Sequence, residues 1–188
     1  MIGFNVLGQL GQLGNQMFQV AALRGIAANK GVNYCFPIHD RVVTDSLGNK
    51  LRVDIHNPFT LQNVHPLNIQ TIDVGRPTMS EGHSQLNEGL FNACPDWVDL
   101  KGFFHTATYF ANASDMIREM FTFRPEIIDP ARQMIDSLNK APVALHIRRG
   151  DFLRNSGNHH NLDLQWYANA LNKFDLDGRQ VAIFSDDP

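Results

Sequence analysis

The residues with the clearest chemical potential follow one short apolar run, residues 143–147, which leads into two arginines, a glycine and an aspartate. In an extended chain, His146 and Arg148 would point to one face, and Gly150 would permit a sharp exit. Ligands of open α/β sheets bind beyond the carboxyl ends of strands, and the planar guanidinium group matches phosphate oxygens. The pattern therefore predicts a phosphate site. The alternative is a surface pair, Arg148 and Arg149, that closes an ordinary strand.

A second polar group, Ser185, Asp186 and Asp187, closes the last strand-like segment, and we expect it at the same edge of the sheet. Paired aspartates can also indicate a metal-dependent sugar transferase. Here the spacing is not that of a DxD motif, and arginine already neutralises phosphate, so we predict no metal. His159 and His160 are adjacent and point apart, which favours a solvated loop over a metal site.

A third group, Gly14, Asn15 and Gln16, stands where a long helix is predicted to begin. The free N–H groups and the dipole of a helix N-terminus favour anions. The segment lacks the GxGxxG pattern and the Lys-Ser/Thr pair of a P-loop, so neither a nicotinamide nor an ATP site is supported. The alternative is a simple tight turn.

The first part of the chain predicts strand, helix and strand. Residues 2–7 form an apolar run of strand length, a buried helix follows and stops at Gly31, and residues 32–36 form a second strand. Residues 41–99 carry scattered Pro, Gly, Asn and His, and predict only short strands. A short helix starts at Ser114 or Asp115 and ends near residue 125.

The last part predicts a β-α-β unit. Asp129 as N-cap and Pro130 at the first helical position begin a helix that ends near residue 140 and leads into the strand at residue 143. Asp163 caps a further helix, and residues 181–187 form the next strand. The expected fold class is α/β: a Rossmann-like N-terminal domain (1–141) followed by the first β-α-β of a second Rossmann-like domain (142–188).

Charge and cysteine content narrow the classes of partner. The 188 residues carry 16 basic and 19 acidic side chains, a net charge of −3, which argues against nucleic acid and anionic membranes as partners. Cys35 and Cys94 cannot form a disulfide framework, so a reducing compartment is expected. The N-terminus has no basic signal region, and the apolar stretch around Arg24 is too short to span a bilayer. We expect a cytoplasmic protein without a membrane span.

Four segments, in order, resemble the α-1,2-fucosyltransferases of bacterial type: GQLGNQMFQVAALRGIA, LKGFFHTATYF, HIRRGDF and IFSDDP. The resemblance covers almost the whole chain. It implies a GT-B-like architecture of two Rossmann-like domains. It also implies transfer of L-fucose from GDP-fucose to the 2-hydroxyl of a galactosyl-type acceptor, with inversion and without metal or cofactor. The partners implied are GDP-fucose and an oligosaccharide or glycan acceptor.

The resemblance also implies roles for single residues. Arg148, as the catalytic group, contacts the β-phosphate of GDP-fucose, and the alternative for it is a structural ion pair. His146 touches guanine or its ribose unless it is a core histidine. Asp186 accepts a hydrogen bond from the same groups. Gly14, Asn15 and Gln16 bring the start of the helix against the donor phosphates. Asp151 holds the arginines or the turn, and Arg149 and Ser185 complete the expected donor site.

The chain departs from the family pattern in several places. Val20 and Phe152 replace tyrosines, and His105 replaces a glutamine. A later block of the family, rich in Ser, Asn and Trp, has no counterpart, so we expect a C-terminally truncated chain that is inactive by itself. No residue is an assured catalytic base. Two alternatives stay open: a noncatalytic GDP-sugar or glycan-binding remnant, and a generic Rossmann-like nucleotide enzyme such as a dehydrogenase.

Overall fold

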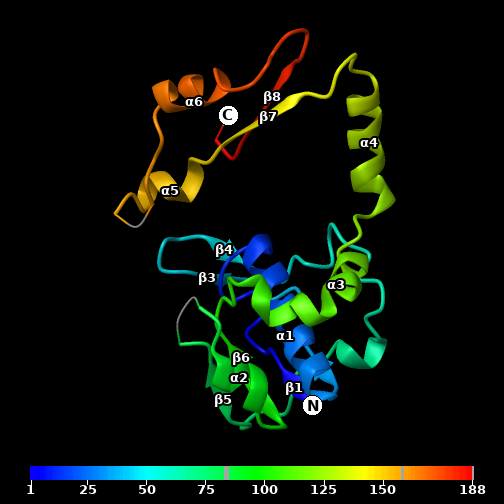
Figure 1. Cartoon of the computed structure of the whole chain (residues 1–188). Coiled ribbons are helices and arrows are strands. Elements are labelled where there is room, and N and C mark those ends of the chain that lie inside the picture. The colour runs from blue at the N-terminus through cyan, green and yellow to red at the C-terminus, as the bar shows by residue number, and fades with distance from the viewer. Residues whose placement is uncertain (83–84, 158, 188) are drawn as a thin grey trace. The chain divides into compact units, whose positions relative to one another are not determined.

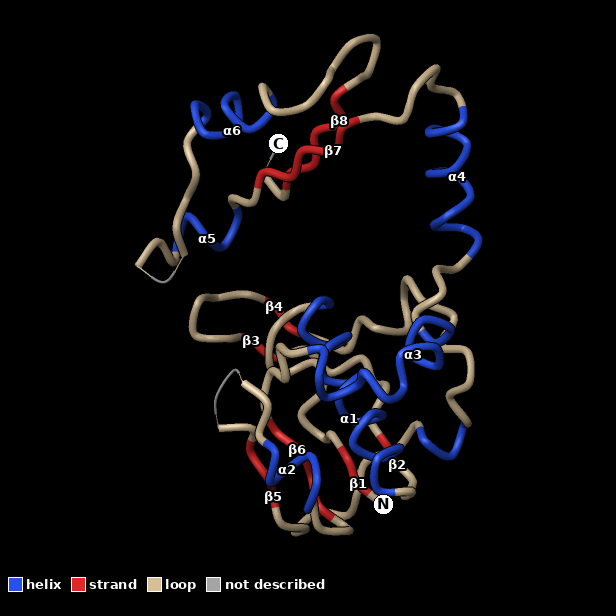
Figure 2. The backbone as a smooth tube through the Cα atoms, viewed as in Figure 1, coloured by secondary structure: helices blue, strands red, loops and turns tan. Residues whose placement is uncertain are grey.

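A computed structural model of the protein describes residues 1–82, 85–157 and 159–187 (Figure 1). The chain forms two compact units: Met1–Asp45 with Lys50–Arg124, and Ser46–Asn49 with Pro125–Pro188. This division falls before the helix at residues 125–136, whereas the predicted domain boundary lies after that helix, between residues 141 and 142. Figure 2 distinguishes the helices and strands of each unit.

The first unit is built on a parallel sheet of four short strands: β1 (Ile2–Gly3), β2 (Tyr34–Cys35), β5 (Thr78–Ser80) and β6 (Val98–Lys101). Their order is β2-β1-β6-β5, and every neighbouring pair is parallel. A separate antiparallel hairpin joins β3 (Val43–Thr44) to β4 (Lys50–Leu51). The parallel sheet confirms the predicted Rossmann-like α/β class, and the GT-B arrangement stays a prediction.

Strand β1 is shorter than the strand predicted at residues 2–7, and that prediction is wrong after Gly3. The backbone N–H of Asn5 leaves the ladder and donates to the Asp99 carboxylate (N to Oδ1, 2.7 Å). A turn then forms, in which the N–H of Leu7 donates to the carbonyl oxygen of Phe4 at 3.2 Å. The chain thus exits the sheet early because a side chain of the neighbouring strand captures its backbone.

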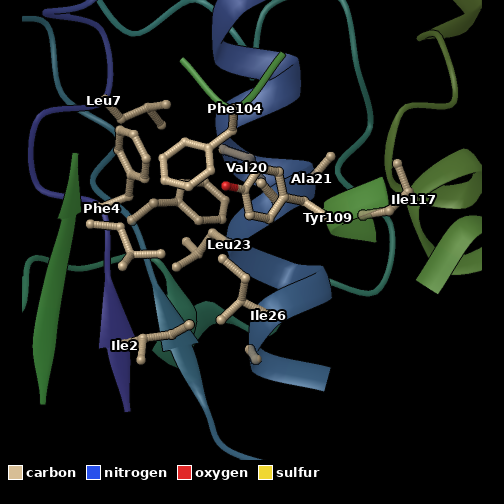
Figure 3. Close-up of a cluster of buried hydrophobic side chains, with 14 of the residues drawn as sticks. Ile2, Phe4, Leu7, Val20, Ala21, Leu23, Ile26, Phe104, Tyr109 and Ile117 are labelled. Carbon is tan, nitrogen blue, oxygen red and sulfur yellow. The ribbon is translucent and has the colours of Figure 1, made fainter. Parts of the chain in front are cut away.

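Helix α1 (Leu13–Lys30) forms the centre of the first unit and ends, as predicted, at Gly31, whose φ of 66° is the left-handed conformation that glycine favours. Ten of its residues are buried. Its apolar side chains pack with those of β1 and of residues 104–117 (Figure 3). A helix that is apolar nearly all round needs cover on every side, which explains this central position.

Shorter helices complete the first unit: η1 (Pro66–Asn68), α2 (Glu88–Ala93), η2 (Ala107–Ala113) and α3 (Ser114–Met120). Helix α3 confirms the predicted short helix, and its Ile117 and Met120 are buried. Neither Ser114 nor Asp115 caps it, because the 3-10 helix η2 runs directly into it and Ala113 takes the N-cap position.

The second unit contains α4 (Pro125–Asp136), β7 (Val143–Ile147), α5 (Gly150–Arg154), α6 (Leu164–Leu171) and β8 (Val181–Ser185). Strands β7 and β8 are parallel and pair in register from Val143↔Val181 to Ile147↔Ser185, so the predicted β-α-β unit is confirmed. The Asp163 side chain caps α6 by accepting from the backbone N–H of Trp166 at 2.7 Å, also as predicted.

The predicted start of α4 is wrong. The helix begins at Pro125, so Pro130 lies inside it and Asp129 is not its N-cap. Both prolines suit the first helical position, where a missing N–H costs nothing, and the fold uses the earlier one. The helix also ends at Asp136, four residues before the predicted end.

Candidate functional site

The carboxyl ends of β7 and β8 meet because the two strands are parallel and paired to their last residues. Arg148 follows β7, and Asp186 follows β8. Their side chains form an ion pair, with 2.8 Å between Nη1 and Oδ2. Sequence reasoning placed both residues at this edge of the sheet, and the register of the strands brings them together.

The guanidinium group of Arg148 has a second carboxylate partner and an aromatic neighbour. Its Nη2 donates to Oδ1 of Asp151 at 2.5 Å. The guanidinium carbon lies 5.1 Å from the ring centre of Phe152, which in turn stacks on His159 with ring centres 3.9 Å apart. Arg148 is therefore held in place from three directions, with about a third of its side chain exposed.

Arg149 contributes its backbone as well as its side chain. Its backbone N–H donates to Oδ1 of Asp186 at 2.8 Å, and its Nε lies 3.4 Å from Oδ2 of Asp187. The N–H of Arg149 holds the pKa of the Asp186 carboxyl below its usual range, and the charges of Arg148 and His146 act in the same direction. Asp186 is thus ionised at neutral pH.

Gly150 is required by the close approach of Asp186. Its φ is +22°, and a Cβ atom at this position would lie 2.6 Å from Oδ2 of Asp186. Any other residue at this position would strain the backbone and push the Asp186 carboxylate out of its present place. The chain then enters α5, a short helix where the sequence had suggested only a turn and a polar loop.

The other predicted residues of this unit lie around the same edge. His146 is exposed on β7 and pairs in register with Phe184. Ser185 binds the backbone of Asp187 in both directions: its Oγ donates to the carbonyl oxygen and accepts from the N–H, each at 3.1 Å. The structure therefore gathers six predicted residues here: His146, Arg148, Arg149, Asp151, Ser185 and Asp186.

The three predicted residues of the first unit differ from one another. Gly14 is exposed, and Oδ1 of Asn15 accepts a hydrogen bond from Nε2 of the His105 ring at 2.7 Å. Gln16 is fully buried. Its amide donates to the carbonyl of Arg52 at 2.8 Å and accepts from the N–H groups of residues 54 and 55. Gln16 anchors a loop, and contact with a ligand would require those bonds to break.

Sequence reasoning missed two partners of this site. It assigned His159 to a solvated loop, whereas the ring is half-buried against Phe152. It named Asp187 without a role, whereas Asp187 pairs with Arg149. Spacing gives no signal for the stack, because the loop between the two rings has no periodicity that would bring them together.

The described residues contain no cluster of three or more His, Cys, Asp or Glu side chains arranged to hold a metal ion. None of the helices within residues 1–82, 85–157 and 159–187 combines the length and apolar character needed to cross a membrane.

The chain is similar to one known protein family over almost its whole length. A family model described as glycosyl transferase family 11 matches residues 2–188, which include both units and every residue of the site. No curated protein and no solved structure matches the chain. The match agrees with the order of the four sequence segments and argues against a dehydrogenase. The chain therefore belongs to glycosyl transferase family 11, a family of fucosyltransferases.

Proposed function

We propose that this fucosyltransferase moves L-fucose from GDP-fucose to the 2-hydroxyl of a galactosyl-type acceptor, with inversion and without a metal ion. The observation that carries the proposal is the place of Arg148. It stands beyond the paired carboxyl ends of two parallel strands, in a chain that the family model matches from residue 2 to residue 188. That edge is where open α/β sheets bind nucleotides.

In the proposed reaction the acceptor oxygen forms a bond to C1 of fucose while the bond from C1 to the β-phosphate oxygen breaks. The proton of the acceptor hydroxyl passes to the departing diphosphate, directly or through water, and GDP leaves with the electron pair of the broken bond. Negative charge therefore grows on the β-phosphate in the transition state. A guanidinium group already held in place stabilises that charge without reorganising, which is the most effective form of electrostatic catalysis.

The arginines of the site are already paired with carboxylates, so a diphosphate has to compete for them. Arg148 and Arg149 face three carboxylates, those of Asp151, Asp186 and Asp187. Phosphate oxygens would compete with these carboxylates for the same N–H groups. We infer that donor binding displaces at least one aspartate from the arginines and that the aspartates orient the guanidinium groups beforehand. In this proposal Asp186, which the structure holds ionised, accepts a hydrogen bond from guanine or ribose.

The proposal is tested with the full-length gene product, GDP-fucose and lactose. We expect a fucosylated trisaccharide whose new linkage, by NMR, is α-1,2, and binding of GDP by calorimetry in the same preparation. Binding of GDP without transfer to lactose or to other galactosyl acceptors would instead indicate the noncatalytic GDP-sugar-binding protein. Binding of neither GDP nor GDP-fucose would overturn the donor assignment.

A further inference from the structure

A pocket of about 410 Å³ in the first unit lies beyond the carboxyl ends of three neighbouring strands. Leu10 comes from the loop after β1. The other lining residues follow or end β5 and β6: Ser80, Glu81, Gly82, Lys101, Gly102 and Phe103. The chain runs from β1 to β2 on one side, while β6 and β5 lie on the other, so the strand order reverses between β1 and β6. Such a reversal opens the crevice in which α/β sheets bind ligands.

Glu81 gives this pocket an unsatisfied acceptor. The residue is 4% exposed. Its Oε2 accepts from the backbone N–H groups of Phe103 at 3.1 Å and Phe104 at 2.7 Å. Its Oε1 is buried and has no hydrogen-bond partner within the part of the chain that the structure describes. A buried acceptor left without a donor is costly, so such an atom marks a place where a ligand can supply one.

The pocket walls are held rigidly by buried Gln19. Its amide nitrogen donates to the carbonyl of Leu10 at 2.9 Å and to that of Gly102 at 3.1 Å, so it ties two walls together. A Cβ atom on Gly102 would lie 2.7 Å from Cβ of Glu81, which shows how closely these walls pack. A ligand would meet a preorganised surface here, which lowers the entropic cost of binding.

The chemistry of the lining selects among ligands. Phe103 is 44% exposed and offers an aromatic face, while Glu81 and Ser80 offer hydrogen-bonding oxygens. A saccharide presents C–H faces that suit an aromatic ring and hydroxyl donors that suit a carboxylate. Lys101 gives the lining a positive charge, but a nucleoside diphosphate bears more than one negative charge and would also meet the buried Glu81 carboxylate, so it is disfavoured.

We propose that this pocket binds the neutral acceptor saccharide, with Phe103 against a sugar face and Oε1 of Glu81 accepting from a sugar hydroxyl. The inference rests on the proposed fucosyl transfer, because it assigns the second substrate of that reaction to named residues. Both residues bind the acceptor, and neither is assigned a role in donor binding.

The test combines binding and kinetics in the full-length gene product. Saturation-transfer NMR reports binding of lactose and of N-acetyllactosamine, and calorimetry reports binding of GDP. Phe103→Ala removes the ring but keeps the backbone N–H that Glu81 needs, and Glu81→Gln keeps an oxygen for the loop. For each variant we expect KM for lactose to rise by about tenfold or more, equivalent to about 1.4 kcal/mol, with GDP binding unchanged.

Two exposed residues serve as matched controls. Phe174→Ala removes a phenyl ring that is 54% exposed on the second unit, and Glu88→Gln removes an exposed carboxylate from the start of α2. Neither control should change KM for lactose. Circular dichroism establishes that each variant folds. If Glu81→Gln does not fold, Phe103→Ala alone tests the pocket assignment.

The outcomes separate this inference from the function on which it rests. Unchanged lactose binding in a folded Phe103→Ala variant, or no saccharide binding by the unaltered protein, overturns the pocket assignment even if GDP binds. Loss of saccharide binding in the variants supports it. If the unaltered protein binds lactose at this pocket but never binds GDP, the proposed transfer fails and the saccharide site stands.

Discussion

Arg148 has two carboxylate partners in the structure, and this decides what a substitution at that position reports. An arginine that only paired with Asp151 and Asp186 would be structural, and its loss would lower stability before activity. An arginine that also contacts the β-phosphate stabilises the charge on that phosphate more in the transition state than in the ground state. Kinetics and stability measured on the same variant therefore separate the two roles.

We expect Arg148→Ala in the full-length gene product to lower the transfer rate by two to three decades, or about 3–4 kcal/mol, while the protein remains folded. Arg148→Lys should recover little of this, because an ammonium group cannot reproduce the fork that two carboxylates now hold. Arg132→Ala is the matched control, since Arg132 is an exposed arginine paired with an aspartate on α4. Near-normal turnover of Arg148→Ala would disprove the phosphate assignment.

Removal of divalent metal tests the same site from another direction. If Arg148, Arg149 and backbone N–H groups neutralise the diphosphate, EDTA should leave the rate of fucosyl transfer unchanged. The assay compares initial rates before and after dialysis against EDTA. Loss of activity that Mn²⁺ or Mg²⁺ restores would show that Asp186 and Asp187 bind a cation instead.

Cys35 provides a pH-dependent measure of the folded core. Burial, followed by the nearby carboxylate of Asp99, raises the pKa of the Cys35 thiol to about 11. The folded state thus holds this proton more tightly than the unfolded chain, whose thiol has a pKa of about 8.5. The associated stability is fully present below about pH 8.5 and is lost as the pH rises toward 11.

At pH 8 we therefore expect iodoacetamide to label Cys35 at least about tenfold more slowly in the folded protein than in urea, because the thiolate is the reactive form. Mass spectrometry of the peptides distinguishes Cys35 from Cys94, which is also buried. Equal labelling rates in the folded and unfolded states would contradict the burial of Cys35.

At the scale of single residues, the sequence predicted which side chains meet where strand geometry determines direction, whereas their role in binding a donor stays a prediction. Alternation along β7 placed His146 and Arg148 on one face, and the parallel register brought Asp186 to the same edge. It could not predict the stack of Phe152 on His159, or that Oε1 of Glu81 is buried without a hydrogen-bond partner among the described residues. Both depend on loops whose course is set by contacts far apart in the sequence.

At the scale of elements, success followed the strength of local signals. Helix α1 ended at its predicted glycine, and α6 began at its predicted aspartate cap. Both signals act within one turn of helix. The start of α4 was wrong because two prolines offered the same signal. Strand β1 was shortened by a bond to Asp99, which lies 94 residues away and leaves no trace in a local pattern.

Two glycines of α1 test how closely this helix packs. A Cβ atom on Gly25 would lie 2.0 Å from the carbonyl oxygen of Tyr109, whereas one on Gly14 would meet nothing within 4 Å. We expect Gly25→Ala to lower the free energy of unfolding by about 1–3 kcal/mol through overpacking. Gly14→Ala should leave it unchanged or raise it by up to about 1 kcal/mol through helix propensity.

Urea denaturation of both variants, monitored by circular dichroism, measures these changes against the unaltered protein. Both variants carry the same glycine-to-alanine change in the same helix, so the difference between their free energies of unfolding reports the packing at each position. Equal stability of the two variants would show that α1 can move away from Tyr109 without cost.

At the scale of the whole molecule, burial differs sharply between the two units. All members of the main hydrophobic core belong to the first unit. In the second unit Val143 and Tyr167 are the buried residues among those described, α4 buries none, and β8 leaves Ile183 and Phe184 more than half exposed. Parallel strands normally have both faces covered, so the β7–β8 pair buries less apolar surface than is usual for such strands.

This difference predicts two levels of protection against hydrogen exchange. Local opening of a segment costs little when few apolar contacts are lost, and it approaches the cost of global unfolding in a buried helix. We therefore expect the amides of α1 to exchange on the order of 100-fold or more slowly than those of α4, although both are regular helices. Exchange followed by mass spectrometry of peptides from residues 13–30 and 125–136 measures both rates in one sample.

Addition of GDP tests the donor site in the same measurement. A ligand that binds the edge of β7 and β8 should slow exchange in residues 143–154 and leave exchange in α1 unchanged. Equal protection of the α1 and α4 amides without GDP would mean that the exposed face of α4 is covered in solution. Contacts from outside the second unit would then stabilise this helix.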